Sequence, residues 1–212
     1  MSKRIAVLVS GGGTNLQALI DAQGRGELGG GQICAVVASK PGVYALERAA
    51  QASIPSYVVA RKDYPSSQAF TIALVDQLRA LDIDLVVLAG FLVILTGEMV
   101  RAFPNAILNV HPALIPSFSG EGCYGLHVHE RALAYGVKVT GATVHFVSEE
   151  CDGGPIVLQK AVDILEGDTP EVLQRRVMEQ AEWVILPQAV ALFCQERLRV
   201  EGRVVHILPP RP

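Results

Sequence analysis

Short, unbroken apolar runs alternate along the first half of the chain with segments in which apolar residues recur every three or four positions. The unbroken runs predict strands buried on both faces, at residues 5–9, 33–38, 56–59, 85–89 and 106–110. The periodic segments predict amphipathic helices beginning near Leu16, at residues 44–52, at residues 66–81, and from Thr96 to residue 103. This alternation predicts a Rossmann-like α/β fold, in which a mostly parallel twisted sheet carries helices on both faces.

The pattern changes after residue 110. A loop rich in Pro, Ser and Gly leads to a predicted helix at residues 126–135. Two extended stretches follow, at residues 139–147 and 156–164, and the short connection between them predicts an antiparallel pair. We therefore expect the sheet to end in an antiparallel C-terminal portion.

The last part of the chain returns to helical periodicity. Thr169 and Pro170 have the residue types of a helix start, and we expect this helix to run to residue 186. Pro187 then predicts the start of a second helix, which continues to residue 197. Residues 203–208 predict a last edge strand.

Composition excludes several classes of protein. Of the 212 residues, 50% are hydrophobic and 18% charged, which indicates a globular protein with a large core. The net charge of −3, without a basic block, argues against a nucleic-acid partner. The longest apolar stretch, at residues 85–95, is too short to cross a membrane, and the apolar run behind the basic start is too short for an export signal.

Cysteine usage points to a reducing compartment. Four cysteines are scattered without metal-ligand or redox spacing: Cys34, Cys123, Cys151 and Cys194. We expect them to be free thiols that pack as small buried hydrophobic residues. The protein is therefore predicted to be soluble and cytoplasmic, with no membrane partner.

A glycine loop, Gly11-Gly12-Gly13, lies between the first strand and the first helix. Free backbone N–H groups and the helix dipole favour an anion there, although a tight turn without a ligand is the simpler alternative. A dinucleotide fingerprint needs a sixth-position glycine, where Leu16 stands, and a P-loop needs a lysine after Gly13. A small phosphorylated metabolite remains the expected ligand.

Two further groups carry candidate chemistry. Asn109 and His111 lie two apart at the end of a predicted strand, so their side chains point the same way. An amide can donate to a developing oxyanion and an imidazole can donate a proton near neutral pH. Asp152, in an Asp-Gly-Gly-Pro turn, could hold a distant imidazole protonated. The alternatives are a core histidine bonded to backbone and an ordinary turn residue.

The other histidines carry weaker signals. His127 and His129 point apart if they lie on a helix, so we expect no metal site. His145 can be either a pocket wall or a satisfied core histidine, and we expect His206 on the surface.

The order of these motifs resembles the phosphoribosylglycinamide formyltransferase family, a branch of the folate-dependent formyltransferases. The similar segments are Ser10-Gly-Gly-Gly-Thr-Asn-Leu, Leu88-Ala-Gly-Phe, Asn109-Val-His-Pro-Ala-Leu-Ile-Pro, Gly141-Ala-Thr-Val-His-Phe-Val and Asp152-Gly-Gly-Pro-Ile. The resemblance implies transfer of a formyl group from 10-formyltetrahydrofolate to the amine of glycinamide ribonucleotide in de novo purine biosynthesis. It also implies that Asn109, His111 and Asp152 are catalytic and that no metal takes part.

The same resemblance implies two binding regions within a single domain over residues 1–212. Residues 1–110 form the phosphate-binding half and residues 111–212 the folate-site and C-terminal helical half. The ribonucleotide is expected to contact Gly12, Gly13, Thr14, Asn15 and, through its ribose, Glu182. The folate is expected to contact Leu92, Val93, Ile94, Leu95, Asn109, Ser148, Glu149, Glu150, Cys151 and Asp152.

Two departures from the family pattern stand out. Val93 replaces a frequent arginine, which weakens an expected contact with the folate tail, and the loop at residues 116–126 is long. A formyltetrahydrofolate deformylase would share the catalytic triad but is expected to carry an additional N-terminal domain. An initiator-tRNA formyltransferase would need a basic surface and a C-terminal domain, and a silent nucleotide-binding module would not need the triad. We expect a monomer or a homodimer.

Overall fold

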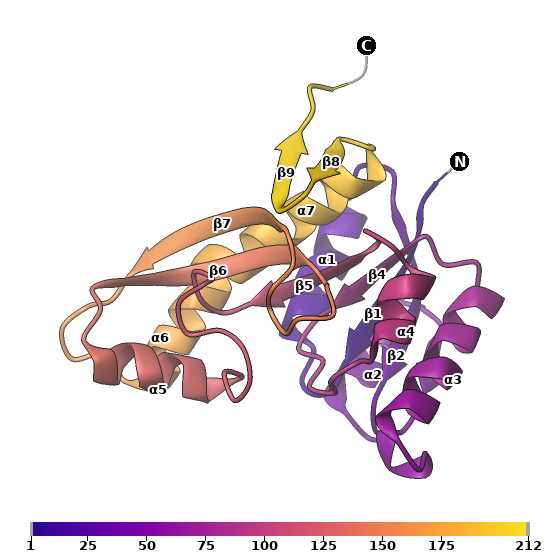
Figure 1. Cartoon of the computed structure of the whole chain (residues 1–212), viewed down its shortest axis with the longest axis horizontal. Helices are drawn as coiled ribbons and strands as arrows, with labels where there is room; N and C mark the ends of the chain where they lie inside the picture. Colours follow the sequence, from indigo (N-terminus) through magenta and orange to yellow (C-terminus); the bar gives the residue numbers. More distant parts are fainter. Residues whose placement is uncertain (1, 211–212) are drawn as a thin grey trace.

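A computed structural model describes residues 2–210 and contains a nine-stranded sheet. The strands lie in the order β3-β2-β1-β4-β5-β6-β7-β9-β8. The first five are parallel and match the predicted runs to within one or two residues: β1 (Arg4–Val9), β2 (Gln32–Ala38), β3 (Ser56–Val58), β4 (Leu85–Leu88) and β5 (Ile107–His111). The predicted Rossmann-like arrangement is confirmed (Figure 1).

Helices cover both faces of this parallel part. They are α1 (Thr14–Gly24), α2 (Tyr44–Gln51), α3 (Ser67–Ala80) and α4 (Gly97–Ala102), with a short 3₁₀ turn at Arg61–Asp63. Successive side chains of a strand point to opposite faces, so Ile5, Val7 and Val9 of β1 join one core cluster while Ala6 and Leu8 join another. The first cluster contains residues of α1 and α2, and the second contains residues of α3 and α4.

The helix start predicted at Thr96 is confirmed in position. Thr96 is the residue before α4, but its side chain makes no capping hydrogen bond. Ser66, before α3, does cap: its hydroxyl accepts a hydrogen bond from the Ala69 N–H at 3.0 Å. The five parallel strands and their helices therefore form where the apolar pattern places them.

Strands β5, β6 and β7 pair antiparallel, as predicted, whereas β7 and β9 pair in parallel at one position. β6 (Val139–Phe146) pairs with β5 and with β7 (Ile156–Asp163) in antiparallel register. Figure 1 shows β6 and β7 extending away from the parallel strands, with α5 (Leu126–Tyr135) and α6 (Pro170–Val177) beside them. The side chain of Thr169 caps α6 by accepting from the Val172 N–H at 3.3 Å.

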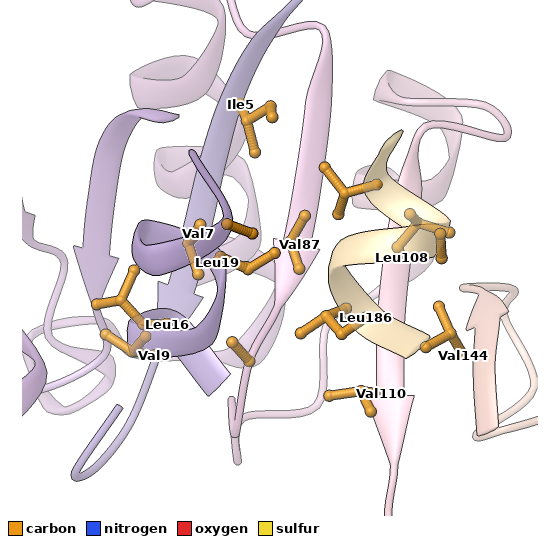
Figure 2. Packing of buried hydrophobic residues seen from close by; sticks show 14 of the residues in the cluster. Ile5, Val7, Val9, Leu16, Leu19, Val87, Leu108, Val110, Val144 and Leu186 are labelled. Atoms are coloured by element: carbon orange, nitrogen blue, oxygen red, sulfur yellow. The ribbon is translucent and has the colours of Figure 1, made fainter. Parts of the chain in front are cut away.

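The predicted break at Pro187 is wrong. A five-residue π turn, Met178–Glu182, follows α6, and α7 (Trp183–Cys194) then runs through Pro187 without ending. Ile185, Leu186 and Ala189 of α7 are buried against the same face of the sheet as α1 (Figure 2). Because this apolar face lies against the core, the helix keeps its course despite the missing proline N–H.

The prediction for the last strand is also wrong in detail. β9 (Val204–Ile207) lies between β7 and β8 (Leu198–Glu201), so β8 is the edge strand. The turn between them contains Gly202 with a positive φ of 60°, a conformation that favours glycine. Along the described chain, no helix combines the length and the apolar character needed to cross a membrane.

Candidate active site

The glycine loop connects β1 to α1 and is shaped by one left-handed residue. Gly13 has φ 73° and precedes the first residue of α1. A Cβ at this position would lie 2.7 Å from the Ala45 Cβ, so no larger residue fits without movement of α2. A Cβ added at Gly11 or Gly12 would have no heavy atom within 4 Å. This leaves space for a ligand beside the backbone of both residues. The N-terminus of α1 and these open peptide groups together favour an anion.

A buried polar pair lies at the start of α1. The Asn15 Nδ2 donates to Glu182 Oε2 at 2.7 Å, although the two residues are 167 positions apart. Glu182 is only 6% exposed, because the π turn directs it into the protein rather than to solvent. Burial raises the pKa of Glu182 to about 7, and the hydrogen bond from Asn15 opposes this increase. Glu182 is therefore not an ordinary exposed helix glutamate.

Asn109 and His111 lie near the end of β5, next to Asp152. The His111 Nδ1 lies 3.4 Å from Asp152 Oδ2, and both side chains are at most 11% exposed. Asp152 has a positive φ of 53°, in a turn closed by a hydrogen bond from the Gly153 N–H to the Glu150 carbonyl at 3.1 Å. The structure thus brings the three predicted catalytic side chains to one edge of the sheet.

His145 belongs to the same group. It stands opposite Asn109 in the β5–β6 register, and its Nε2 lies 3.1 Å from Asn109 Nδ2 and 3.6 Å from Asp152 Oδ1. Its Nδ1 lies 2.9 Å from the Phe146 carbonyl, which can only accept, so Nδ1 carries the hydrogen. A neutral ring then accepts at Nε2 from the Asn109 amide. The 3.6 Å separation from Asp152 is too long for a hydrogen bond, and this contact stabilises the carboxylate when the His145 ring is charged.

Residues 116–125, here called the site loop, reach both His111 and Asp152 through their backbone. The Phe118 carbonyl lies 2.8 Å from His111 Nε2, and the Gly120 N–H donates to Asp152 Oδ2 at 2.9 Å. The sequence did not indicate either contact, because both use peptide groups that every residue possesses.

The charges of the site are set by burial and by these neighbours. Burial lowers the pKa of His111, and the nearby His145 lowers it further. The Asp152 charge and the Phe118 carbonyl raise this pKa, but they offset the decrease only in part. Burial would raise the pKa of Asp152, but His145, the charge of His111 and the Gly120 N–H outweigh it and lower that pKa. Asp152 is therefore a carboxylate at neutral pH.

The predicted folate contacts form two adjoining segments. Leu92 and Ile94 are exposed apolar side chains, whereas Val93 and Leu95 pack against the core. The second segment, residues 148–151, is joined to the first because the Glu149 carboxylate lies beside Gly97 and pairs with Arg101 at 3.3 Å. Its remaining members, Ser148, Glu150 and Cys151, lead directly into Asp152, and the Ser148 hydroxyl donates to the Glu150 carbonyl at 3.0 Å.

The first of these segments is also linked to the glycine loop. The Ser10 hydroxyl accepts from the Leu92 N–H at 3.0 Å, and the Ser10 N–H donates to the Gly90 carbonyl at 3.1 Å. The anion loop and the first apolar segment therefore lie side by side at the carboxyl edge of the parallel strands, where such sheets bind ligands.

Other residues singled out in the sequence lie elsewhere. His127 is exposed and contacts Glu130 at 2.8 Å, whereas His129 is buried and no partner for its ring nitrogens is present among the described residues. His206 is on the surface beside Glu201, as predicted. All four cysteines are free, but only Cys123 is buried and Cys151 is exposed, so the prediction of four buried thiols is wrong.

The chain matches known proteins over nearly its whole length. A family model described as formyl transferase matches residues 3–190. Phosphoribosylglycinamide formyltransferase of Haemophilus influenzae is 42% identical over 205 residues, which cover 97% of this chain and 93% of that protein. The trifunctional purine biosynthetic protein adenosine-3 of Drosophila pseudoobscura pseudoobscura is 43% identical over 93% of this chain, but the chain spans only 14% of that relative's length.

Solved structures agree with the sequence matches. Glycinamide ribonucleotide transformylase 1 from Symbiobacterium toebii superimposes with a TM-score of 0.92 and is 46% identical. The superposition covers 98% of this chain and 95% of that one. The chain therefore belongs to the formyl transferase family.

Proposed function

We propose that the chain transfers the formyl group of 10-formyltetrahydrofolate to the primary amine of glycinamide ribonucleotide, in de novo purine biosynthesis. The observation that carries the proposal is the contact of His111 with Asp152 beside Asn109, at the sheet edge that also holds an anion loop. The names of the Haemophilus and Symbiobacterium relatives support the choice of acceptor.

The ribonucleotide fits the first half of the site. Its phosphate binds the peptide N–H groups of Gly12 and Gly13 and the start of α1 at Thr14 and Asn15, where the helix dipole favours negative charge. Glu182 accepts hydrogen bonds from the ribose hydroxyls, because it is the buried carboxylate next to Asn15. The bound nucleotide then directs its amine toward the end of β5.

The folate fits the second half. Its apolar ring packs on Leu92 and Ile94, and the backbone of residues 148–151 supplies hydrogen bonds to the polar edge of the ring. Asn109 and Asp152 lie at the inner end of these segments, so the formyl carbon lies against them. Val93 lacks the charge that an arginine would offer the glutamate tail.

The chemistry follows from the charges of the three side chains. The neutral amine attacks the formyl carbon, so a C–N bond forms and the carbonyl oxygen becomes an oxyanion. Asn109 Nδ2 has a second hydrogen besides the one that it directs to His145, and it donates this hydrogen to the oxyanion. The positive charge of the protonated His111 ring stabilises the same oxyanion through space, because its Nε2–H is held by the Phe118 carbonyl. Asp152 orients His111, and the pair moves the proton lost by the amine, through water, to the folate nitrogen as its bond to the formyl carbon breaks.

The test is an assay with 10-formyltetrahydrofolate, with and without glycinamide ribonucleotide. Formyl loss that requires the ribonucleotide and yields formylated product supports the transferase. Equal loss in its absence identifies a hydrolase, and ribonucleotide binding without formyl loss identifies a silent binding module. Thermal shift with the ribonucleotide alone measures binding separately from turnover.

Two finer predictions accompany this function. A single domain, with its phosphate-binding half at residues 1–110 and its folate half at 111–212, acts as a monomer or a homodimer, which sedimentation at several concentrations measures. A cytoplasmic location follows from the predicted use of a folate cosubstrate and from four free thiols, and fractionation of cells tests it.

A further inference from the structure

We infer that the backbone of the site loop positions His111: the Phe118 carbonyl keeps a hydrogen on Nε2, so Nδ1, which faces Asp152, is the nitrogen that exchanges the catalytic proton. The contact itself is a property of the free protein. Its catalytic meaning rests on the proposed function.

The hydrogen-bonding roles follow from what each partner can do. A carbonyl oxygen only accepts, and it lies 2.8 Å from His111 Nε2, so this nitrogen must carry a hydrogen in every charge state of the ring. A neutral imidazole has a single N–H, and the Phe118 contact therefore leaves Nδ1 as the unprotonated nitrogen. When the ring is charged, Nδ1–H points to Asp152 Oδ2 at 3.4 Å.

The groups facing His111 from other elements agree with this assignment. Asp152 faces it from the turn before β7, His145 from β6, and His129 from α5. Asp152 is the one carboxylate among them, and it attracts a second proton to Nδ1, the nitrogen that the Phe118 contact leaves free to titrate. His145 opposes positive charge on the His111 ring. Neither histidine offers Nε2 an alternative acceptor at hydrogen-bond distance in the described structure.

The site loop is fixed firmly enough to hold a carbonyl in place. Phe118 has a positive φ of 51°, a conformation that a bulky residue adopts only when its surroundings impose it. Its ring packs with Ala113, Cys123 and Val128 and makes an edge contact with the Tyr135 ring, with centroids 6.0 Å apart. These contacts place the ring on one side of the peptide chain and the carbonyl on the other, toward His111.

Both ends of the site loop are anchored as well. Before it, the Thr143 hydroxyl donates to the Ala113 carbonyl at 2.7 Å, and the Gln159 amide donates to the Ile115 carbonyl at 2.9 Å. Farther along, the Gly120 N–H binds Asp152, and an Arg131 N–H contacts the Cys123 sulfur at 2.7 Å. One short segment therefore fixes both members of the proton-transferring pair.

The consequence is a definite path for one proton. During transfer the amine loses one proton, and the folate nitrogen gains one when its bond to the formyl carbon breaks. With Nε2–H held by the site loop, the proton passes between water, Asp152 and Nδ1. The Nε2 hydrogen is not consumed, so the ring returns to its starting tautomer after each turnover.

The decisive variant makes the Phe118 carbonyl a weaker hydrogen-bond acceptor. It has the same side chains as its matched control and differs from that control only in the backbone. Lactic acid incorporated at position 119 replaces the Phe118–Ser119 amide by an ester, whose carbonyl is a poorer acceptor. Ser119→Ala is the amide control, because both variants lose the hydroxyl that donates to the Pro116 carbonyl at 3.0 Å. The Ser119 N–H donates to no protein acceptor in the described residues, so its removal breaks no other hydrogen bond.

The first readout is the nitrogen NMR spectrum of histidine-labelled free protein during a pH titration, with the His111 signals identified by their loss in His111→Gln. In the Ser119→Ala protein we expect Nε2 to stay protonated throughout and Nδ1 to titrate. In the ester protein we expect a mixture of neutral tautomers and a lower pKa for His111, because the carbonyl contact raises it. A neutral ring protonated on Nδ1 in the amide protein would overturn the inference.

The second readout is turnover. We expect the ester to lower kcat by about threefold to tenfold relative to Ser119→Ala, with KM for the ribonucleotide within about twofold, because the ester weakens one hydrogen bond without removing it. Equal kcat and equal pH profiles in the two proteins would also overturn it. Phe118→Ala should act in the same direction, and Tyr135→Ala, which removes the ring in edge contact with Phe118, should do so more weakly. Failure of the proposed function would instead leave the tautomer intact but abolish ribonucleotide-dependent transfer in every protein, including the unaltered chain.

Discussion

The two halves of the sheet hold their functional groups in different ways. In the parallel half the anion site is local: one strand end, one left-handed glycine and the first turn of α1 form it within a few residues. In the antiparallel half the catalytic group is assembled from distant segments, because His111 meets Asp152 from 41 positions away and Asn109 meets His145 from 36. The first site depends on conformation at single positions, and the second depends on strand register and loop docking.

The largest effect should come from the assembled half. His111→Ala removes a group that is used mainly in the transition state, and we expect kcat to fall by about 10² to 10³-fold. Circular dichroism and the melting temperature should show a folded protein. His206→Ala, a change of the same type on the surface, is the control and should retain its kcat. Near-normal turnover of His111→Ala would reject the catalytic role.

Asp152→Asn tests the pairing within that half. The Asp152 charge raises the pKa of His111, so the variant should hold His111 charged only at lower pH. If transfer needs the charged ring, activity is lost as pH rises through the His111 pKa, and the basic limb of the kcat profile should move to lower pH. We expect kcat at neutral pH to fall by about 10- to 100-fold. Asp163→Asn, which changes an exposed carboxylate on β7, is the control and should keep the parent profile. The same profile in Asp152→Asn and the control would contradict the pairing.

Gly13→Ala tests the local half. A non-glycine residue in this left-handed conformation costs about 1–2 kcal/mol, and its Cβ also collides with the Ala45 Cβ. We expect KM for the ribonucleotide to rise by about tenfold or more while kcat changes less. Gly24→Ala, at the other end of α1 with open space around it, should behave like the parent chain. A change in kcat alone would show that the two halves are not separable.

Glu182→Gln should have the smallest effect on turnover. Its main effect should be on the pH dependence of the free energy of unfolding. The pKa of Glu182 is raised to about 7 from the ordinary 4.5, so the folded state binds a proton that the unfolded state releases. This stabilisation is complete below pH 4.5 and is lost as pH rises through 7, on the order of 3 kcal/mol in all. Glu182→Gln should remove that slope from the unfolding free energy measured in urea without ligand. Glu179→Gln, exposed in the same π turn, should keep it.

The same contrast explains what the sequence could predict. β1 to β5 and their helices form where apolar runs and helical spacing place them, since each element buries its own pattern. The Asn109 and His111 pair was predictable because a strand repeats every two residues. Their meeting with Asp152 was predicted through a family resemblance and not through any local rule.

What the sequence missed depends on contacts between distant segments. His145 joins the site because β6 places it opposite Asn109, and the β6–β7 register shifts beside it, between Val144 and His145. β8 was missed because its four residues read as a helix end until Gly202 turns the chain back. The Phe118 and Gly120 contacts involve peptide groups, which carry no signature in the choice of amino acid.

The π turn has a consequence for the helical region as a whole. In a regular α-helix, residues four apart drift steadily around the axis, and a stripe such as Leu173, Val177, Ala181, Ile185 and Ala189 would wind off the sheet. The wider π turn between α6 and α7 offsets this rotation around the axis, so the apolar sides of both helices face the core. The same turn leaves the Glu182 side chain buried. Deleting one residue between Met178 and Glu182 would therefore do two kinds of damage at once: it would rotate α7 by about 100° and move the buried Glu182 carboxylate away from Asn15.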